Sequence, residues 1–305
     1  MSFDRLIRKI QEKNNPTVAG LDPKLAYIPA FLREEAYARC GKTLEGAAEA
    51  LFLFNQGLID ALCDIVPAVK PQAAYYELYG WAGMRALCRT IAYAQEKGLF
   101  VITDGKRNDI GSTMEAYALA HLGATQVEEE SFEAFGTDAL TVNGYLGSDG
   151  IHPLLKVCDE KDKGIFVLVK TSNPSSGELQ DRTFEDGLSV SRTMGTMCEQ
   201  WGSERIGAFG YSSVGAVVGA TYPQQLADLR KELPHTFFLV PGYGAQGGGA
   251  KDVAGAFDEK GLGAVINSSR GIMCAYQKEG CAPEDYAQAA RREALRMRNE
   301  LNSCR

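Results

Sequence analysis

The segment from Asp104 to Asp109 brings Asp104, Lys106 and Asp109 close together, directly after a largely apolar run at 99–103. Such a run predicts a buried strand, and because side chains in a strand alternate between two faces, Asp104 and Lys106 are expected to share a face. Two carboxylates around one ammonium are costly to bury unless the charges neutralise each other or a ligand. A fixed ammonium can stabilise developing negative charge and donate a proton, although a surface salt bridge in a turn would use the same residue types.

The elements that must position these residues follow a regular alternation of short apolar runs and longer amphipathic ones. Predicted strands lie at 16–21, 65–70, 99–104, 139–142, 165–170, 215–219, 236–240 and 263–267, and helical patterns follow at, for example, 44–62, 77–97 and 283–301. Eight strand-then-helix units predict an α/β protein with a single (β/α)8 TIM-barrel domain over residues 1–305. A doubly wound sheet is the alternative, but it favours a G-x-G-x-x-G motif after the first strand, which is absent there.

Polar residues recur where the predicted strands end. In a barrel the carboxyl ends of all strands converge on one site, so these residues are its candidates. They are Asp22, Lys70, Asp104, Lys106, Asn143, Ser172 and Arg270, with the glycine-rich stretch 242–249 that contains Gln246. Lys170 also ends a predicted strand and is interpreted as an ordinary strand-end lysine.

The last two strand ends indicate a phosphate site. Loops after the seventh and eighth strands are the habitual phosphate site of such barrels. Glycines in the 242–249 stretch allow backbone N–H groups to approach an anion, Gln246 can donate through its amide, and the guanidinium of Arg270 suits phosphate oxygens.

Composition excludes several other classes of protein. The formal net charge of -7 disfavours nucleic acid or an anionic membrane as a partner, and no apolar run is long enough to cross a bilayer. Residues 1–13 have the pattern of an amphipathic helix and lack the apolar core of a signal peptide. The 8 cysteines form no C-x-x-C pair, and the 3 histidines lack metal-ligand spacing, so a cytoplasmic protein without a metal site is expected. Segments 27–42 and 127–136 have the appearance of loop insertions.

Together these motifs resemble the orotidine 5'-phosphate decarboxylase family, in its longer bacterial-type form. The resemblance is carried by the run from Asp104 to Thr113, which reads D-x-K-R-x-D-I-G-S-T, with Gly-Leu-Asp-Pro at 20–23, Gly-Ala-Gln-Gly-Gly at 244–248 and Ser-Arg-Gly at 269–271. It covers most of the chain, and the combination is specific although each part alone would not be.

The resemblance implies roles for nine residues. Lys106 would donate a proton to C6 of the pyrimidine, Asp104 would lie beside the departing carboxylate, and Lys70 would bridge Asp104 and the ribose. The other implied substrate contacts are Asp22 to the ribose, Ser172 to the pyrimidine edge, Gln246 and Arg270 to the 5'-phosphate, and Asp109 with Thr113 from a neighbouring subunit.

The implied reaction is loss of CO2 from orotidine 5'-phosphate to give UMP, the last step of UMP biosynthesis. It would need no cofactor and would take place in a homodimer with shared sites. Two alternatives stay open. One is a related barrel lyase that decarboxylates a sugar-phosphate β-keto acid with a metal ion, and the other is a barrel that binds a nucleotide without turning it over.

Overall fold

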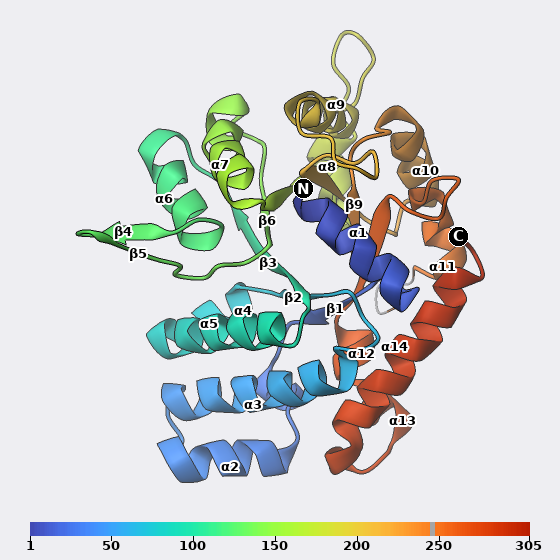
Figure 1. Ribbon diagram of the computed structural model, residues 1–305. Coiled ribbons are helices and arrows are strands. Elements are labelled where there is room, and N and C mark those ends of the chain that lie inside the picture. The colour runs from blue at the N-terminus through green and yellow to red at the C-terminus, as the bar shows by residue number, and fades with distance from the viewer. Residues whose placement is uncertain (245–247) are drawn as a thin grey trace.

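The computed structural model describes residues 1–244 and 248–305. Eight parallel strands close into a barrel in the order β1-β10-β9-β8-β7-β6-β3-β2 (Figure 1). The barrel strands are β1 (Thr17–Leu21), β2 (Ala68–Pro71), β3 (Phe100–Arg107), β6 (Ala139–Val142), β7 (Gly164–Lys170), β8 (Val214–Val218), β9 (Phe238–Val240) and β10 (Ala264–Ser268). The predicted (β/α)8 barrel is therefore confirmed, and the open doubly wound sheet is excluded.

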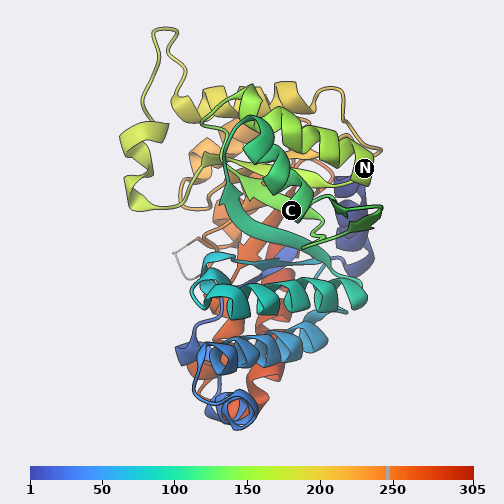
Figure 2. The ribbon, with the colours of Figure 1, turned by 90° about the vertical axis from the view of Figure 1, so that its left-hand side faces the viewer.

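Helices cover the outside of the barrel (Figures 1 and 2). The longer ones are α1 (Ser2–Lys13), α2 (Ala30–Cys40), α3 (Leu44–Leu62), α5 (Gly80–Glu96), α6 (Gly111–His121), α7 (Ser148–Lys161), α9 (Val190–Gly202), α10 (Pro223–Glu232) and α14 (Tyr286–Asn302). Shorter ones are α4 (Ala74–Glu77), α8 (Gly177–Gln180), α11 (Ala250–Val253), α12 (Arg270–Met273), α13 (Ala275–Glu279) and the 3-10 turns η1 (Leu25–Tyr27), η2 (Pro174–Ser176), η3 (Ala254–Ala256) and η4 (Pro283–Asp285). No described helix is both long and apolar enough to cross a membrane.

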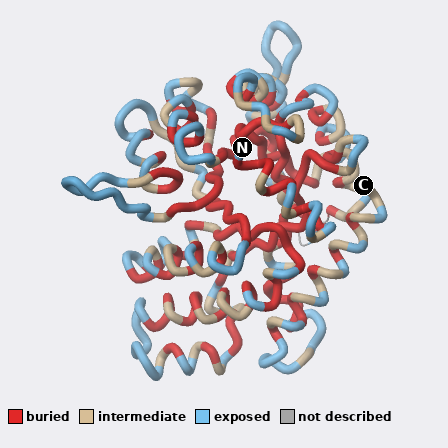
Figure 3. The backbone as a smooth tube through the Cα atoms, in the orientation of Figure 1, coloured by how far each residue is buried: buried red, intermediate tan, exposed pale blue. Residues whose placement is uncertain are grey.

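The two segments that resemble insertions have different structures. Most of 27–42 forms α2, which packs against α3 and so extends the helical layer. Part of 127–136 belongs to an antiparallel hairpin of β4 (Thr125–Val127) and β5 (Glu130–Phe132), in which every strand residue is exposed. Figure 3 shows this hairpin in pale blue, well away from the red interior of the barrel.

The amphipathic pattern of residues 1–13 produces α1, which closes the amino-terminal end of the barrel. Phe3 is fully buried, and its ring stacks on Phe166 of β7 with centroids 4.7 Å apart. Asp4 accepts hydrogen bonds from the backbone N–H groups of Ala208 and Phe209, in the loop that leads into β8. With this end sealed, the polar strand ends at the opposite, carboxyl face are the accessible ones.

Candidate active site

A pocket with a volume of about 660 Å³ lies at the carboxyl ends of the barrel strands. Six of the nine predicted site residues line it, namely Asp22, Lys70, Asp104, Lys106, Ser172 and Arg270. They lie in or directly after five different strands. Residues that are far apart in the sequence, such as Asp22 and Arg270, therefore share one cavity. This convergence is the expected consequence of parallel strands in a closed barrel.

Asp104 lies at the centre of a charged cluster in this pocket. Its Oδ2 accepts a hydrogen bond from Lys70 Nζ at 2.6 Å, and its Oδ1 accepts from Lys106 Nζ at 2.6 Å and from Thr141 Oγ1 at 2.8 Å. Lys70 and Asp104 are only 4% and 7% exposed, whereas the Lys106 side chain is 46% exposed. Lys106 is therefore the member of the cluster that can approach a bound molecule.

Opposite charges keep the cluster ionised in spite of its burial. Burial acts to raise the pKa of Asp104, but the charges of Lys70 and Lys106 and their hydrogen bonds outweigh it and hold that pKa well below its ordinary value. Burial likewise acts to lower the pKa of Lys70, but the nearby carboxylates of Asp104 and Asp22 raise it overall. Lys70 and Asp104 are thus held as a buried ion pair at neutral pH.

A bulge in β3 brings Lys106 onto Asp104. The pairing of β3 with β6 shifts register between Thr103 and Arg107, and Lys106 has a left-handed backbone with φ of 47°. Its N–H donates to Thr141 Oγ1 at 3.0 Å, which holds this conformation. The side chains of Asp104 and Lys106 do meet, but because of the bulge and not because of the simple alternation of a regular strand. A left-handed backbone in a non-glycine residue such as Lys106 is strained, and strain of this kind is typical of functional sites.

Two acceptor atoms in the pocket have no partner among the described residues. The Oδ1 atoms of Asp22 and Asn267 are both buried and make no hydrogen bond within residues 1–244 and 248–305. Buried polar atoms are normally satisfied, so each is suited to accept a hydrogen bond from the hydroxyl or N–H group of a ligand.

Of the two phosphate candidates, the structure describes Arg270. Arg270 begins α12, directly after β10, and lines the pocket wall. Gln246 lies outside the described residues. Tyr243, before it, is buried and donates a hydrogen bond to Glu300 Oε2 of α14 at 2.6 Å, so the end of β9 is tied to the last helix.

The chain does not bring Asp109 and Thr113 to its own pocket. Neither is among the described residues that line it. Asp109 accepts a hydrogen bond from the N–H of Ile110, and Thr113 lies exposed in the first turn of α6. Thr113 is therefore available at the surface for contact with another molecule, whereas Asp109 is half-buried.

Three residues near the site were given no functional role from the sequence. Thr141 is the one polar residue in the apolar run at 139–142, and its side chain points to the same inner face of the barrel as that of Ala139. A single polar residue on an inward-facing position could have marked it as a site residue. Asn267 is the penultimate residue of β10, two positions before the Ser-Arg-Gly motif at 269–271. Lys170, expected to be an ordinary strand-end lysine, is instead fully buried and ion-paired with Asp181.

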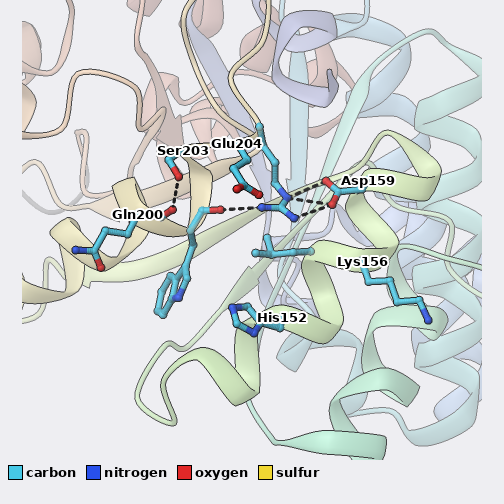
Figure 4. A pocket seen from close by; sticks show the side chains of 9 residues that line it. His152, Lys156, Asp159, Gln200, Ser203 and Glu204 are labelled. Atoms are coloured by element: carbon cyan, nitrogen blue, oxygen red, sulfur yellow. Dashed lines mark hydrogen bonds and ion pairs between the residues drawn. The ribbon is translucent and has the colours of Figure 1, made fainter.

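A second hollow, of about 470 Å³, lies on the outer wall between α7 and α9 (Figure 4). Here Arg205 donates to both carboxylate oxygens of Asp159, at 2.8 to 3.1 Å, and to the carbonyl of Trp201 at 3.2 Å. The guanidinium therefore links the end of α9 to α7. Among the described residues around this hollow, none belongs to the predicted site.

Comparisons with known proteins agree with this geometry. The sequence model of the Orotidine 5'-phosphate decarboxylase / HUMPS family matches residues 55–282. The orotidine 5'-phosphate decarboxylase of Rhodopirellula baltica is 48% identical, with 93% of each chain covered, and that of Caldicellulosiruptor saccharolyticus is 42% identical, with 90% of each covered. The structure of Leishmania donovani OMP decarboxylase has a TM-score of 0.73 at 30% identity, covering 98% of this chain and 99% of that one.

Fold and site together define a closed (β/α)8 barrel with a charged pocket at the carboxyl ends of its strands. The chain belongs to the orotidine 5'-phosphate decarboxylase family. The resemblance found in the motifs is thus confirmed.

Proposed function

We propose that this chain decarboxylates orotidine 5'-phosphate to UMP. The observation that carries the proposal is the position of Asp104 between the ammonium groups of Lys70 and Lys106, at the carboxyl end of β3. Curated relatives of the same length bear the name of this enzyme. The activity is that of a carboxy-lyase in the UMP branch of pyrimidine biosynthesis.

The reaction breaks the bond between C6 of the pyrimidine and its carboxyl carbon. The electron pair stays on C6, and CO2 leaves. Lys106 stabilises this negative charge and then donates a proton from Nζ to C6, which yields UMP and a neutral amine that regains a proton from water. Asp104 orients Lys106 and lies beside the departing carboxylate, so ionised Asp104 and the substrate carboxylate repel each other before the bond breaks.

The remaining pocket residues bind the parts of the substrate that do not react. Asp22 accepts a hydrogen bond from a ribose hydroxyl, which its unpartnered Oδ1 supports. Ser172 contacts the edge of the pyrimidine, while Gln246 and Arg270 hold the 5'-phosphate. Contacts with the phosphate, which is distant from C6, supply binding energy. When the site closes, that energy lowers the barrier for the reaction at C6.

The functional unit is a homodimer in which Asp109 and Thr113 of one subunit complete the pocket of the other. The position of both residues outside the pocket of their own subunit and the exposure of Thr113 support this arrangement. The only other partners are the substrate and product, with no cofactor, metal, nucleic acid or membrane. A cytoplasmic location is supported by the eight cysteines, all of which are free.

The test is to add purified protein to orotidine 5'-phosphate, with and without EDTA, and to follow the ultraviolet change as UMP forms. Turnover that EDTA does not affect is expected. Turnover that EDTA abolishes would favour the metal-dependent sugar-phosphate class, whereas UMP binding without turnover would favour a nucleotide-binding barrel that has no activity.

A further inference from the structure

Lys170 occupies an unusual position for a lysine. It ends β7, its side chain is 0% exposed, and its Nζ donates to Asp181 Oδ1 at 2.8 Å and to Asp181 Oδ2 at 2.9 Å. The ammonium also lies 4.3 Å from the ring centroid of Tyr222. Burying an ammonium is unfavourable unless a partner compensates its charge, so this pair must hold together in the folded protein.

The pair closes the base of the loop that carries Ser172. Asp181 follows Lys170 by eleven residues, at the end of α8. Directly beside it is a second link, in which Thr171 N–H donates to Gln180 Oε1 at 2.9 Å and Gln180 Nε2 donates to Thr171 Oγ1 at 2.8 Å. Two adjacent cross-links thus form a neck, which we define as Lys170–Asp181 together with Thr171–Gln180.

Ser172 lies immediately after this neck and has little room to move. Its backbone packs on Gly219 so closely that a Cβ added to Gly219 would lie 2.9 Å from Ser172 N and Cα. Thr221 Oγ1 donates to the carbonyl of Ser172 at 3.3 Å. Ser172, Thr171 and Gln180 all line the pocket, so the Thr171–Gln180 half of the neck faces it, whereas Lys170 and Asp181 are not among the described residues that line it.

We propose that Lys170 is a positioning residue: paired with Asp181, it closes the neck and so holds Ser172 against the pyrimidine end of the substrate. This inference rests on the proposed function for the identity of the substrate. It assigns Lys170 no chemistry at C6, because its ammonium is engaged by Asp181 and enclosed by Tyr222.

The first test needs no substrate. Lys170→Met keeps the length and burial of the side chain but removes the charge, and hydrogen–deuterium exchange of the peptide spanning 171–181 is measured in the unliganded protein. We expect exchange in this peptide to accelerate at least about tenfold, while peptides of β7 and β8 stay unchanged. Unchanged exchange in 171–181 would overturn the proposal, whether or not the protein proves to be a decarboxylase.

The second test separates positioning from general loosening of the pocket. UMP and ribose 5-phosphate share the sugar and phosphate, and UMP alone has the pyrimidine. Calorimetry should show that Lys170→Met weakens UMP binding about tenfold, as for the loss of one hydrogen bond, and changes ribose 5-phosphate binding by less than about twofold. Equal weakening of both ligands, or of neither, would contradict a role toward the pyrimidine end.

Two further variants sharpen the comparison. Asp181→Asn leaves the ammonium of Lys170 buried without its counter-charge, so it should accelerate exchange in 171–181 more than the double variant Lys170→Met/Asp181→Asn does. Arg205→Met removes another two-pronged ion pair, with Asp159 on the outer wall, and serves as the matched control that should leave 171–181 unchanged. If the wild-type protein neither binds UMP nor turns over orotidine 5'-phosphate, the proposed function fails. The exchange data would still show whether Lys170 holds the neck closed.

Discussion

At the scale of single residues, the chemistry rests on how Asp104 is surrounded. Its two oxygens accept from Lys70 on the inner side and from Lys106 and Thr141 on the other. The ion pair of Lys70 and Asp104 is buried, whereas Lys106 is exposed to the pocket and is hydrogen-bonded to Asp104. This asymmetry is the physical reason to assign the proton transfer to Lys106 and not to Lys70.

Replacement of that ammonium is the direct test. In Lys106→Met, kcat is expected to fall about 10³-fold or more, because both the stabilising charge and the proton donor are lost. UMP affinity should change by less than about tenfold, since phosphate and ribose contacts remain. Stopped-flow absorbance and calorimetry measure the two quantities. The exposed Lys231→Met on α10 is the control, and near-normal turnover in Lys106→Met would refute the assignment.

The charge cluster also makes a prediction about pH. The lowered pKa of Asp104 means that its ionised form stabilises the fold above the unfolded-state value of about 3.9, and that this contribution is lost as the pH falls through the folded-state pKa. At pH 7, Asp104→Asn should therefore lower the free energy of unfolding by about 3 kcal/mol, because two ammoniums lose their counter-charge. The gap to wild type should stay constant between about pH 5 and 9 and shrink below about pH 4.

Urea unfolding of wild type and Asp104→Asn at pH 7, 4 and 3 measures this gap. At the alkaline end, the raised pKa of Lys70 keeps its contribution in place below about 10.5, the ordinary value for lysine, and loses it only as the pH rises through the folded-state pKa. A gap as large at pH 3 as at pH 7 would show that the stabilisation is not due to the ionised carboxylate.

At the scale of elements, the two ends of the barrel have separate tasks. Helix α1 seals the amino-terminal end with four buried apolar side chains, Phe3, Leu6, Ile7 and Ile10. The carboxyl-terminal parts of strands β2, β3 and β6 carry the residues of the charged cluster. Stability and substrate contact are thus placed on opposite faces, as in other barrels of this class.

Truncation of a buried aromatic side chain of α1 should affect stability far more than catalysis. Phe3→Ala removes a ring that contacts both Phe166 and Phe237, so the free energy of unfolding should fall by about 3–5 kcal/mol. KM, measured well below the melting temperature, should stay within about twofold of wild type, since α1 is remote from the pocket. Glu12→Ala, on the exposed side of the same helix, is the control. An altered KM with unchanged stability would contradict this separation.

At the scale of the whole molecule, one chain leaves part of its predicted site at the surface. Asp109 and Thr113 lie outside their own pocket, next to Ile110, which is 51% exposed. An exposed apolar residue between two polar candidates suits a contact with a second copy, and in a twofold dimer each copy would complete the other.

Mixing two inactive variants tests the shared site. Asp109→Ala and Lys106→Ala should each be inactive alone, whereas subunit exchange between them should restore roughly a quarter of wild-type activity, because half of the dimers are mixed and each has one intact site. Differently tagged subunits, purified by both tags, isolate the mixed dimer for the assay. An inactive mixed dimer would place Asp109 in the site of its own subunit.

Much of this protein was determined by the sequence itself. The apolar run at 139–142 and the helical pattern at 44–62 coincide with β6 and α3 at both ends, because buried parallel strands and amphipathic helices leave strong local patterns. Eight such units specify a barrel, and a barrel brings its strand ends to one pocket. For that reason Asp22, Lys70 and Arg270 could be grouped in advance, although long stretches of chain separate them.

Only the tertiary structure decided how the grouped residues meet. The bulge that turns Lys106 back onto Asp104 depends on the register between β3 and β6, which no local pattern records. The burial of Lys170 depends on Asp181, from a loop whose course the sequence did not reveal. Local patterns report which face a side chain takes, whereas its charge partners are set by packing between segments distant in sequence, and that information exists only once the chain has folded.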